Sequence, residues 1–320
     1  LLIRGTSVGF IKYLVDGIDI VSYSGTQNIL QTLDPNDIEK IEVLKGPMAS
    51  TLYGNGGAGG IISITTKKGM EGKTHINFRT MFTQYANDYA DYAGYNQNYS
   101  LNISGGGEQF NYFLGVGYNL YPTTKLTDIN NGIEDKTWSY TAKIRGKLSN
   151  ISADLSLQYG NEYKGVGSTT PSNNKYRVSL GLSPLTVSPL SDSRYSQRSF
   201  LTTLHLTHTV ADNWYHDLTI GYNIMNQVIN YYTKSGLATY NNFELLLSKM
   251  NVRYFMFYDH PWSEDLKSSI TAGFEYNGYE IHLMSISSTT PLTDFFTSFT
   301  PATANSASFN KSPYSSTGYF

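Results

Sequence analysis

The chain has 320 residues, of which 29 are glycine and 27 tyrosine, with 15% charged residues and a formal net charge of -2. This composition favours a β-rich chain without a basic field for nucleic acid, and the lack of cysteine excludes disulfides, thiol catalysis and cysteine-ligated metal. No apolar run approaches the roughly 18 residues of a membrane-spanning helix. A β-barrel, whose strands are apolar on one face only, remains compatible with a mean hydropathy of -0.31.

Residues 1–70 are predicted to form a small mixed α/β unit. Short apolar runs at residues 13–15, 41–44 and 61–66 are separated by turns rich in glycine and aspartate. Pro47 follows the second run and is expected to begin a short helix. The glycines after that helix let the backbone reverse tightly before the β-branched strand at 61–66.

The spacing Gly54-x-Gly56-x-x-Gly59 matches a dinucleotide-binding fingerprint. Such a loop must follow a strand and open a helix, whose N-terminus holds the pyrophosphate. Here the order is reversed, because a predicted helix precedes the glycines and a strand follows them. Nucleotide binding is therefore not expected.

Residues 71–320 are predicted to be strands of an antiparallel transmembrane β-barrel. In residues 110–120 every second residue is apolar, and the strands at 137–148 and 151–159 alternate in the same way. One face of each strand suits lipid and the other suits water. This pattern predicts an all-β membrane protein, with about ten strands present.

The connections between these strands alternate between short and long, as in outer-membrane barrels with short periplasmic turns and long extracellular loops. Short links are expected at residues 105–108, 149–150, 211–215 and 261–265, and long ones at 84–96, 121–136, 160–197, 230–246 and 281–313. The first strand, at 73–83, precedes a long loop and so starts on the periplasmic side. The last strand is expected to begin near Tyr314.

Aromatic residues cluster where strands meet loops, as in the girdles at the two bilayer interfaces, although aromatics also favour strands in general. The clusters are Tyr85, Tyr89, Tyr92, Tyr95 and Tyr99; Trp214 and Tyr215; Tyr231 and Tyr232; and Trp262. Ten strands are too few to enclose a folded domain, for which about 22 are needed. We therefore expect the C-terminus to be truncated, and the start at Leu1, without a methionine or a signal peptide, leads us to expect the same of the N-terminus.

Several motifs, in order, resemble the C-terminal half of the plug of TonB-dependent outer-membrane receptors. They include Ile-Arg-Gly at 3–5, Val-Asp-Gly at 15–17, Ile-Glu-Val-Leu-Lys-Gly-Pro at 41–47, Leu-Tyr-Gly at 52–54 and Thr-Thr-Lys-Lys-Gly at 65–69. The candidate plug-motif residues are Arg4, Gly5, Asp16, Gly17, Glu42, Lys45, Gly46, Pro47, Tyr53, Gly54, Gly59, Gly60, Thr66 and Lys67.

The resemblance implies active import of a glycan, peptide or metal chelate across the outer membrane of a Gram-negative bacterium, without a cofactor. The TonB-ExbB-ExbD complex would be the partner, through a segment N-terminal to Leu1, and the loops at 160–197 and 281–313 would bind substrate. Arg4 is the candidate for pairing with a barrel carboxylate, the alternative being a solvated arginine.

Two branches of the family remain open. The Thr-Thr-Lys-Lys-Gly ending at residue 69 resembles the SusC/RagA branch, which imports glycans or peptides with a SusD-like surface lipoprotein and would indicate a Bacteroidota bacterium. The sequence Lys45-Gly46-Pro47-Met48 instead resembles siderophore receptors.

Two other function classes are alternatives to a transporter. One is an outer-membrane adhesin or secretion-associated scaffold with a vestigial plug. The other is an enzyme, which would need a facing catalytic set. His205 is expected to face the lumen and His208 the opposite side, while His216 would cap a periplasmic turn. No histidine pair has metal-ligand spacing with supporting carboxylates, and no serine lies in a nucleophile elbow, so no catalytic or metal site is predicted.

Overall fold

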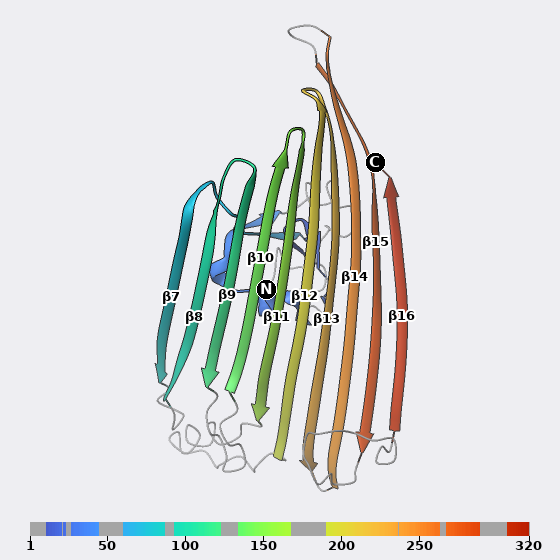
Figure 1. The fold of residues 1–320 in the computed structure, drawn as a ribbon. Helices are drawn as coiled ribbons and strands as arrows, with labels where there is room; N and C mark the ends of the chain where they lie inside the picture. The colour runs from blue at the N-terminus through green and yellow to red at the C-terminus, as the bar shows by residue number, and fades with distance from the viewer. Residues whose placement is uncertain are drawn as a thin grey trace.

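The computed structural model describes residues 11–20, 22–23, 27–44, 60–86, 93–122, 134–167, 190–235, 237–262, 267–288 and 306–319. These residues form a small inner unit and a large antiparallel sheet, which we call the wall (Figure 1). No helix in the described part has the length and apolarity to cross a bilayer.

The inner unit is built on a four-stranded sheet in the order β2-β1-β6-β5. Its strands are β1 (Lys12–Val15), β2 (Ile18–Asp19), β5 (Ile38–Leu44) and β6 (Ile61–Thr66). The β-branched β6 lies in the middle, parallel to β1 and antiparallel to β5. Two 3-10 helices, η2 (Ile29–Thr32) and η3 (Pro35–Asp37), lead into β5, and β3 (Ser22–Tyr23) pairs with β4 (Gln27–Asn28).

The wall contains ten strands that pair in chain order. They are β7 (Gly72–Ala86), β8 (Ala93–Gly106), β9 (Phe110–Pro122), β10 (Glu134–Leu148), β11 (Ile151–Gly167), β12 (Leu190–Ala211), β13 (Trp214–Ser235), β14 (Leu237–Pro261), β15 (Lys267–Ser288) and β16 (Ser306–Tyr319). The predicted number of strands and their antiparallel arrangement are confirmed.

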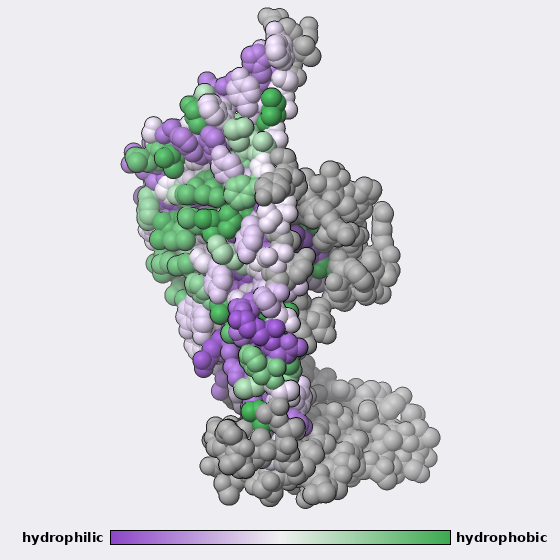
Figure 2. Space-filling view, turned by 90° about the vertical axis from the view of Figure 1, so that its right-hand side faces the viewer, coloured by the Kyte–Doolittle hydropathy of each residue, from purple (hydrophilic) through white to green (hydrophobic). Residues whose placement is uncertain are grey.

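The alternation predicted in the wall corresponds to its two faces. In β9, Leu114 and Val116 are exposed on the outer face, whereas Asn111 and Asn119 are buried on the inner face. Hydrophobic residues gather in a band on the face away from the inner unit, with hydrophilic residues bordering it (Figure 2). An outer apolar band and a polar inner face are the arrangement of a transmembrane barrel.

The short turns lie at one end of the wall and the long connections at the other (Figure 1). Several strands run further than predicted at the long-loop end. The expected loop at 230–246 is mostly strand, since β13 continues to Ser235 and β14 begins at Leu237, and β16 begins at Ser306 rather than near Tyr314. Polar residues there still pair through their backbones, so loss of apolar alternation marks the edge of the apolar band and not the end of the strand. The helix predicted after Pro47 lies outside the described residues.

Candidate functional site

The contact between the inner unit and the inner face of the wall, which we call the seam, brings together buried ion pairs and buried carboxyl groups. Its centre is the turn between β1 and β2. Asp16 has φ 48° and Gly17 has φ 83°, a left-handed conformation that glycine adopts freely and that aspartate tolerates better than most residues. The turn therefore presents the Asp16 carboxylate toward the wall.

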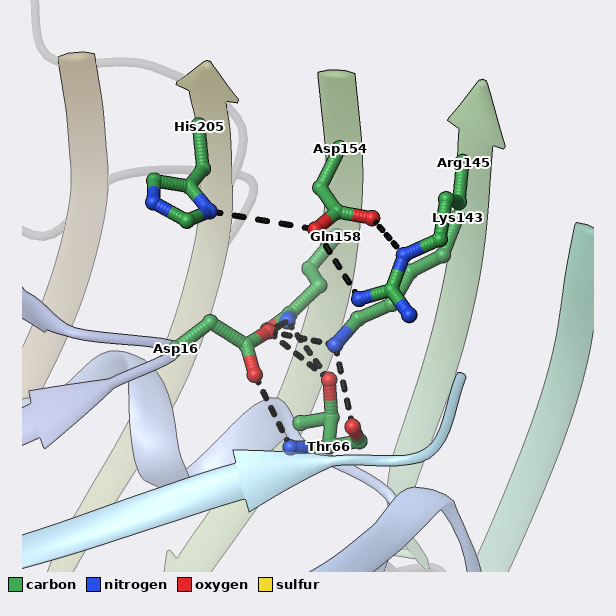
Figure 3. Close-up of polar contacts among 7 residues, drawn as sticks. All are labelled: Asp16, Thr66, Lys143, Arg145, Asp154, Gln158 and His205. Atoms are coloured by element: carbon green, nitrogen blue, oxygen red, sulfur yellow. Dashed lines mark hydrogen bonds and ion pairs between the residues drawn. The ribbon is translucent and has the colours of Figure 1, made fainter. Parts of the chain in front are cut away.

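The Asp16 carboxylate is surrounded by four donors (Figure 3). It accepts hydrogen bonds from the Thr66 backbone N–H at 2.9 Å, from Thr66 Oγ1 at 2.8 Å and from Gln158 Nε2 of β11 at 3.1 Å. Lys143 Nζ of β10 lies 2.8 Å from the carboxylate and also donates to the Thr66 carbonyl oxygen at 3.1 Å. The side chains of Asp16 and Lys143 are only 11% and 9% exposed, so this buried pair is held by its partners and not by water.

A second ion pair crosses the seam at β2. The Asp19 carboxylate lies 2.6 Å from Lys249 Nζ of β14 and 3.2 Å from Lys12 Nζ of β1. The Asp19 carbonyl oxygen also accepts hydrogen bonds from the Asn223 and Asn251 side chains of the wall. At both ion pairs across the seam in the described part of the chain, the inner unit supplies the acid and the wall supplies the base.

Glycines on the inner face of the wall leave room for the inner unit. A Cβ atom added at any of four glycines would collide with a side chain of the inner unit, so only a residue without a side chain fits there. The pairs are Gly115 with Asp37, Gly117 with Asp34, Gly160 with Thr32, and Gly221 with Ile18. Beside one of these sites, Thr32 Oγ1 and Ser199 Oγ of β12 are 2.5 Å apart.

Two carboxyl groups of the inner unit, Asp34 and Asp37, are buried at these glycines, 1% and 0% exposed. Asp34 caps η3 by accepting from the Asn36 backbone N–H at 2.8 Å. Burial raises the pKa of Asp37 to about 6, although a hydrogen bond with Thr141 of β10 opposes the shift. The seam thus contains a carboxyl group whose pKa is raised above the ordinary range by burial.

The wall also contributes to the apolar core of the inner unit. Leu201 of β12 is 1% exposed and packs with four buried residues of the inner unit, which are Val15, Ile18, Ile20 and Ile64. Other apolar side chains are buried on the inner face as well, among them Met225, Leu245 and Leu247, but Leu201 is the wall residue that joins the plug cluster. The seam is therefore part polar network and part shared core.

On the short-turn side of Asp16 the seam opens into a cavity of about 250 Å³. A row of charged side chains on the wall borders it (Figure 3). Arg145 of β10 binds both carboxylate oxygens of Asp154 of β11, and His205 Nε2 of β12 lies 2.6 Å from the Asp217 carboxylate of β13. His205 Nδ1 also lies 3.8 Å from Asp154.

The family model that matches the chain is described as the TonB-dependent receptor plug domain and covers residues 1–61. The chain therefore shares the plug domain of TonB-dependent receptors. The inner unit is its plug, lying against the inner face of a barrel wall. The predicted fold class, a transmembrane antiparallel β-barrel with a small plug domain, is confirmed.

Similarity to curated receptors is concentrated in part of the chain. The ferric aerobactin receptor of Klebsiella pneumoniae is 32% identical over 108 residues, which are 34% of this chain and 14% of that receptor. The TonB-dependent receptor SusC of Bacteroides thetaiotaomicron is 42% identical over 62 residues, 19% of this chain and 6% of that receptor. The matches thus span a small share of these relatives.

The fold is shared over nearly the whole chain. The RagAB peptide importer in its closed-closed state superposes with a TM-score of 0.72 at 13% identity, covering 96% of this chain and 46% of that chain. At this identity the likeness shows the fold alone. The chain spans about half of that structure.

The predicted plug-motif residues fall into three groups. Asp16, Gly17 and Thr66 meet at the centre of the seam, and the Lys67 backbone N–H donates to the Asp37 carbonyl oxygen at 2.7 Å. The Gly60 carbonyl oxygen accepts from the backbone N–H of β1, whereas Glu42 forms an exposed ion pair within β5. Outside the described residues lie Arg4, Gly5, Lys45, Gly46, Pro47, Tyr53, Gly54 and Gly59.

The histidines of the wall lie mostly as predicted. His205 borders the luminal cavity, and His208 lies on the opposite, outer face, where its ring stacks on His216. The cap predicted for His216 is wrong, because its Nδ1 lies 2.6 Å from the Tyr254 hydroxyl on the neighbouring strand. Within the described residues no group of three metal-ligating side chains occurs.

The wall residues of the seam were not predicted from the sequence. Lys143 and Gln158 contact Asp16, and Lys249 contacts Asp19. In each of these three contacts the two residues are more than a hundred positions apart in the chain. The local signal was the polar inward face of β10, on which Lys143 follows hydroxyl residues and precedes Arg145 and Lys147.

Proposed function

We propose that the protein carrying this chain imports a solute across the outer membrane of a Gram-negative bacterium, driven by TonB-ExbB-ExbD, when the plug moves away from the wall. The nature of the seam supports this proposal. Hydrogen bonds and ion pairs make up most of it, each worth little net free energy because water can replace the lost partner. A plug held largely by such polar contacts can leave and return, and the apolar contact that it gives up is the one with Leu201.

We further take residues 1–70 as plug and 71–320 as wall, because β6 ends at Thr66 and β7 begins at Gly72. The apolar outer face would contact lipid, with the short turns in the periplasm and the long loops outside. The names of relatives suggest two substrate classes, ferric siderophores and peptides. Because the RagAB structure is that of a peptide importer, we take a peptide as the first substrate to test and a SusD-like surface lipoprotein as the partner.

A reversible lock between plug and wall tests the proposal. Thr32 Oγ1 and Ser199 Oγ are 2.5 Å apart, and the chain has no cysteine of its own. A Thr32→Cys, Ser199→Cys double variant should therefore form a disulfide on oxidation. We expect oxidation to abolish uptake of labelled peptides and a reductant to restore it.

The single variant Thr32→Cys is the matched control and should transport under both conditions. Uptake should also stop in cells that lack TonB. Transport that continues through the locked receptor, or without TonB, would contradict the proposal. Parallel measurements with a ferric siderophore in place of the peptide decide the substrate class.

A further inference from the structure

The cavity on the short-turn side of Asp16 has an excess of positive charge. Its lining includes four permanent cations, Lys68, Lys143, Arg145 and Arg253, against the two carboxylates Asp16 and Asp154. The plug supplies one of the cations and the wall the other three. The cavity therefore joins the two parts of the receptor at a point where two positive charges are in excess.

Two of these cations are already neutralised. Lys143 pairs with Asp16 at 2.8 Å, and Arg145 binds Asp154 through two nitrogens. Such pairs leave little attraction for a further anion. The excess charge must therefore come from the remaining two cations.

Lys68 and Arg253 form no hydrogen bond or ion pair within the described residues, yet both line the cavity. Arg253 Nη2 lies 3.5 Å from the position that a Cβ on Gly17 would occupy. Because the plug has a glycine there, no side chain at position 17 covers the guanidinium group. Its planar set of donors, which matches the two oxygens of a carboxylate or phosphate, stays open to the cavity.

The size of the cavity suits a small charged group. A volume of about 250 Å³ equals the liquid volume of about eight water molecules. Partly desolvated walls strengthen the attraction between a fixed cation and an entering anion.

We propose that this cavity is a transit site for an oxyanion group, a carboxylate or phosphate, of the imported solute, with Arg253 and Lys68 as its ligands. The site lies past the plug turn on the way to the short-turn end. That direction of travel rests on the proposed function, whereas the binding chemistry rests on the cavity alone. The site would hold the charged end of a solute that has passed the seam and release it as water enters.

Isothermal titration calorimetry on the natural polypeptide in detergent, at low ionic strength, tests the binding. The probes are citrate, inorganic phosphate and the uncharged molecule glycerol. Citrate, phosphate or both should bind, and glycerol should not. The stronger of the two anions indicates whether carboxylate or phosphate is the preferred group, and added salt should weaken its binding.

Arg253→Gln and Lys68→Gln should each raise the dissociation constant of the bound anion at least tenfold. Lys147→Gln is the matched control, since Lys147 lies on the same strand and face as Lys143 but outside the cavity. Heat-dependent mobility on gels checks that every variant keeps its barrel. The proposal is overturned if neither anion binds, or if Arg253→Gln and Lys68→Gln bind like Lys147→Gln.

The two proposals fail separately. Uptake that depends on TonB, together with no anion binding by the purified receptor, would refute the transit site and leave import standing. Anion binding that is lost in Arg253→Gln, together with uptake that persists without TonB, would refute the import mechanism and leave the site standing.

Discussion

Lys143→Met removes the charge that faces Asp16 while keeping a side chain of similar length. Asp16 then retains its hydrogen bonds from Thr66 and Gln158 but loses its counter-ion. Removing one partner of a buried ion pair costs about 3–5 kcal/mol. The retained donors place the loss near the lower end, at about 3 kcal/mol, which is roughly a 100-fold change in an equilibrium constant.

Hydrogen–deuterium exchange of the natural polypeptide measures this loss directly, because amide exchange of a local unit reports its opening equilibrium. The amides of β1 and β6 should exchange roughly 100-fold faster in Lys143→Met, in line with about 3 kcal/mol. The amides of the wall strands should change little. Lys147→Met is the control, because Lys147 is exposed and makes no ion pair within the described residues.

A double variant separates the unpaired charge from lost packing. Asn at position 16 keeps a hydrogen-bonding side chain and tolerates the positive φ of the turn. Adding Asp16→Asn to Lys143→Met should therefore slow exchange relative to Lys143→Met alone. If Lys143→Met exchanges like Lys147→Met, or if the double variant exchanges faster than Lys143→Met, the ion pair does not hold the plug and the reasoning is refuted.

Three further predictions concern the rest of the seam. Gly160→Ala should displace the plug residue Thr32 at a cost of about 1–3 kcal/mol and make cells permeable to large antibiotics. Gly146→Ala is the control, because nothing lies within 4 Å of its new Cβ atom, and it should not raise permeability. Equal permeability in the two variants would contradict the close packing of Thr32 against Gly160. Asp37 has a pKa of about 6 in the folded state, against an ordinary value of 3.8 for an aspartate. The folded state therefore binds more protons between these values, and stability should fall as pH rises through that window, by up to about 3 kcal/mol. Asp37→Asn should remove this decrease in the thermal unfolding midpoint, and an unchanged pH profile would rule out Asp37 as its source. Leu201→Ala should destabilise the plug by about 2–5 kcal/mol and speed amide exchange in β1 and β6. Leu204→Ala, on the outer face of the same strand, is the control and should leave that exchange unchanged. Equal exchange in the two variants would show that the plug core is complete without the wall.

Much of the wall could be predicted from the sequence because each strand carries its own information. Alternation in residues 110–120 assigned Leu114 to the outer face and Asn119 to the inner face, as observed. The extent of the strands could not be predicted in the same way. The alternation of apolar and polar residues stops at the edge of the apolar band. Backbone pairing in β13 nevertheless continues to Ser235, since a strand in water still forms hydrogen bonds with its neighbour.

The sequence predicted the plug residues of the seam but not the wall residues that contact them. Asp16, Gly17 and Thr66 stand in motifs of the plug, so the sequence indicated that they matter but not what they contact. Their wall partners depend on how ten strands place residues against a separate unit, and Gln158 lies 142 positions from Asp16. Local patterns cannot encode such contacts. The inward glycines of the wall were visible in the alternation, yet their role became clear only with the plug in place.

The packing of Leu201 has a consequence for the order in which the molecule is assembled. Of the five buried residues in that cluster, four come from the plug and one from β12. A unit as small as the plug buries little apolar surface by itself, so its core is finished only when β12 is already in position. We therefore expect the plug, although it precedes β12 in the chain, to reach its final packing only after β12 has taken its place in the wall.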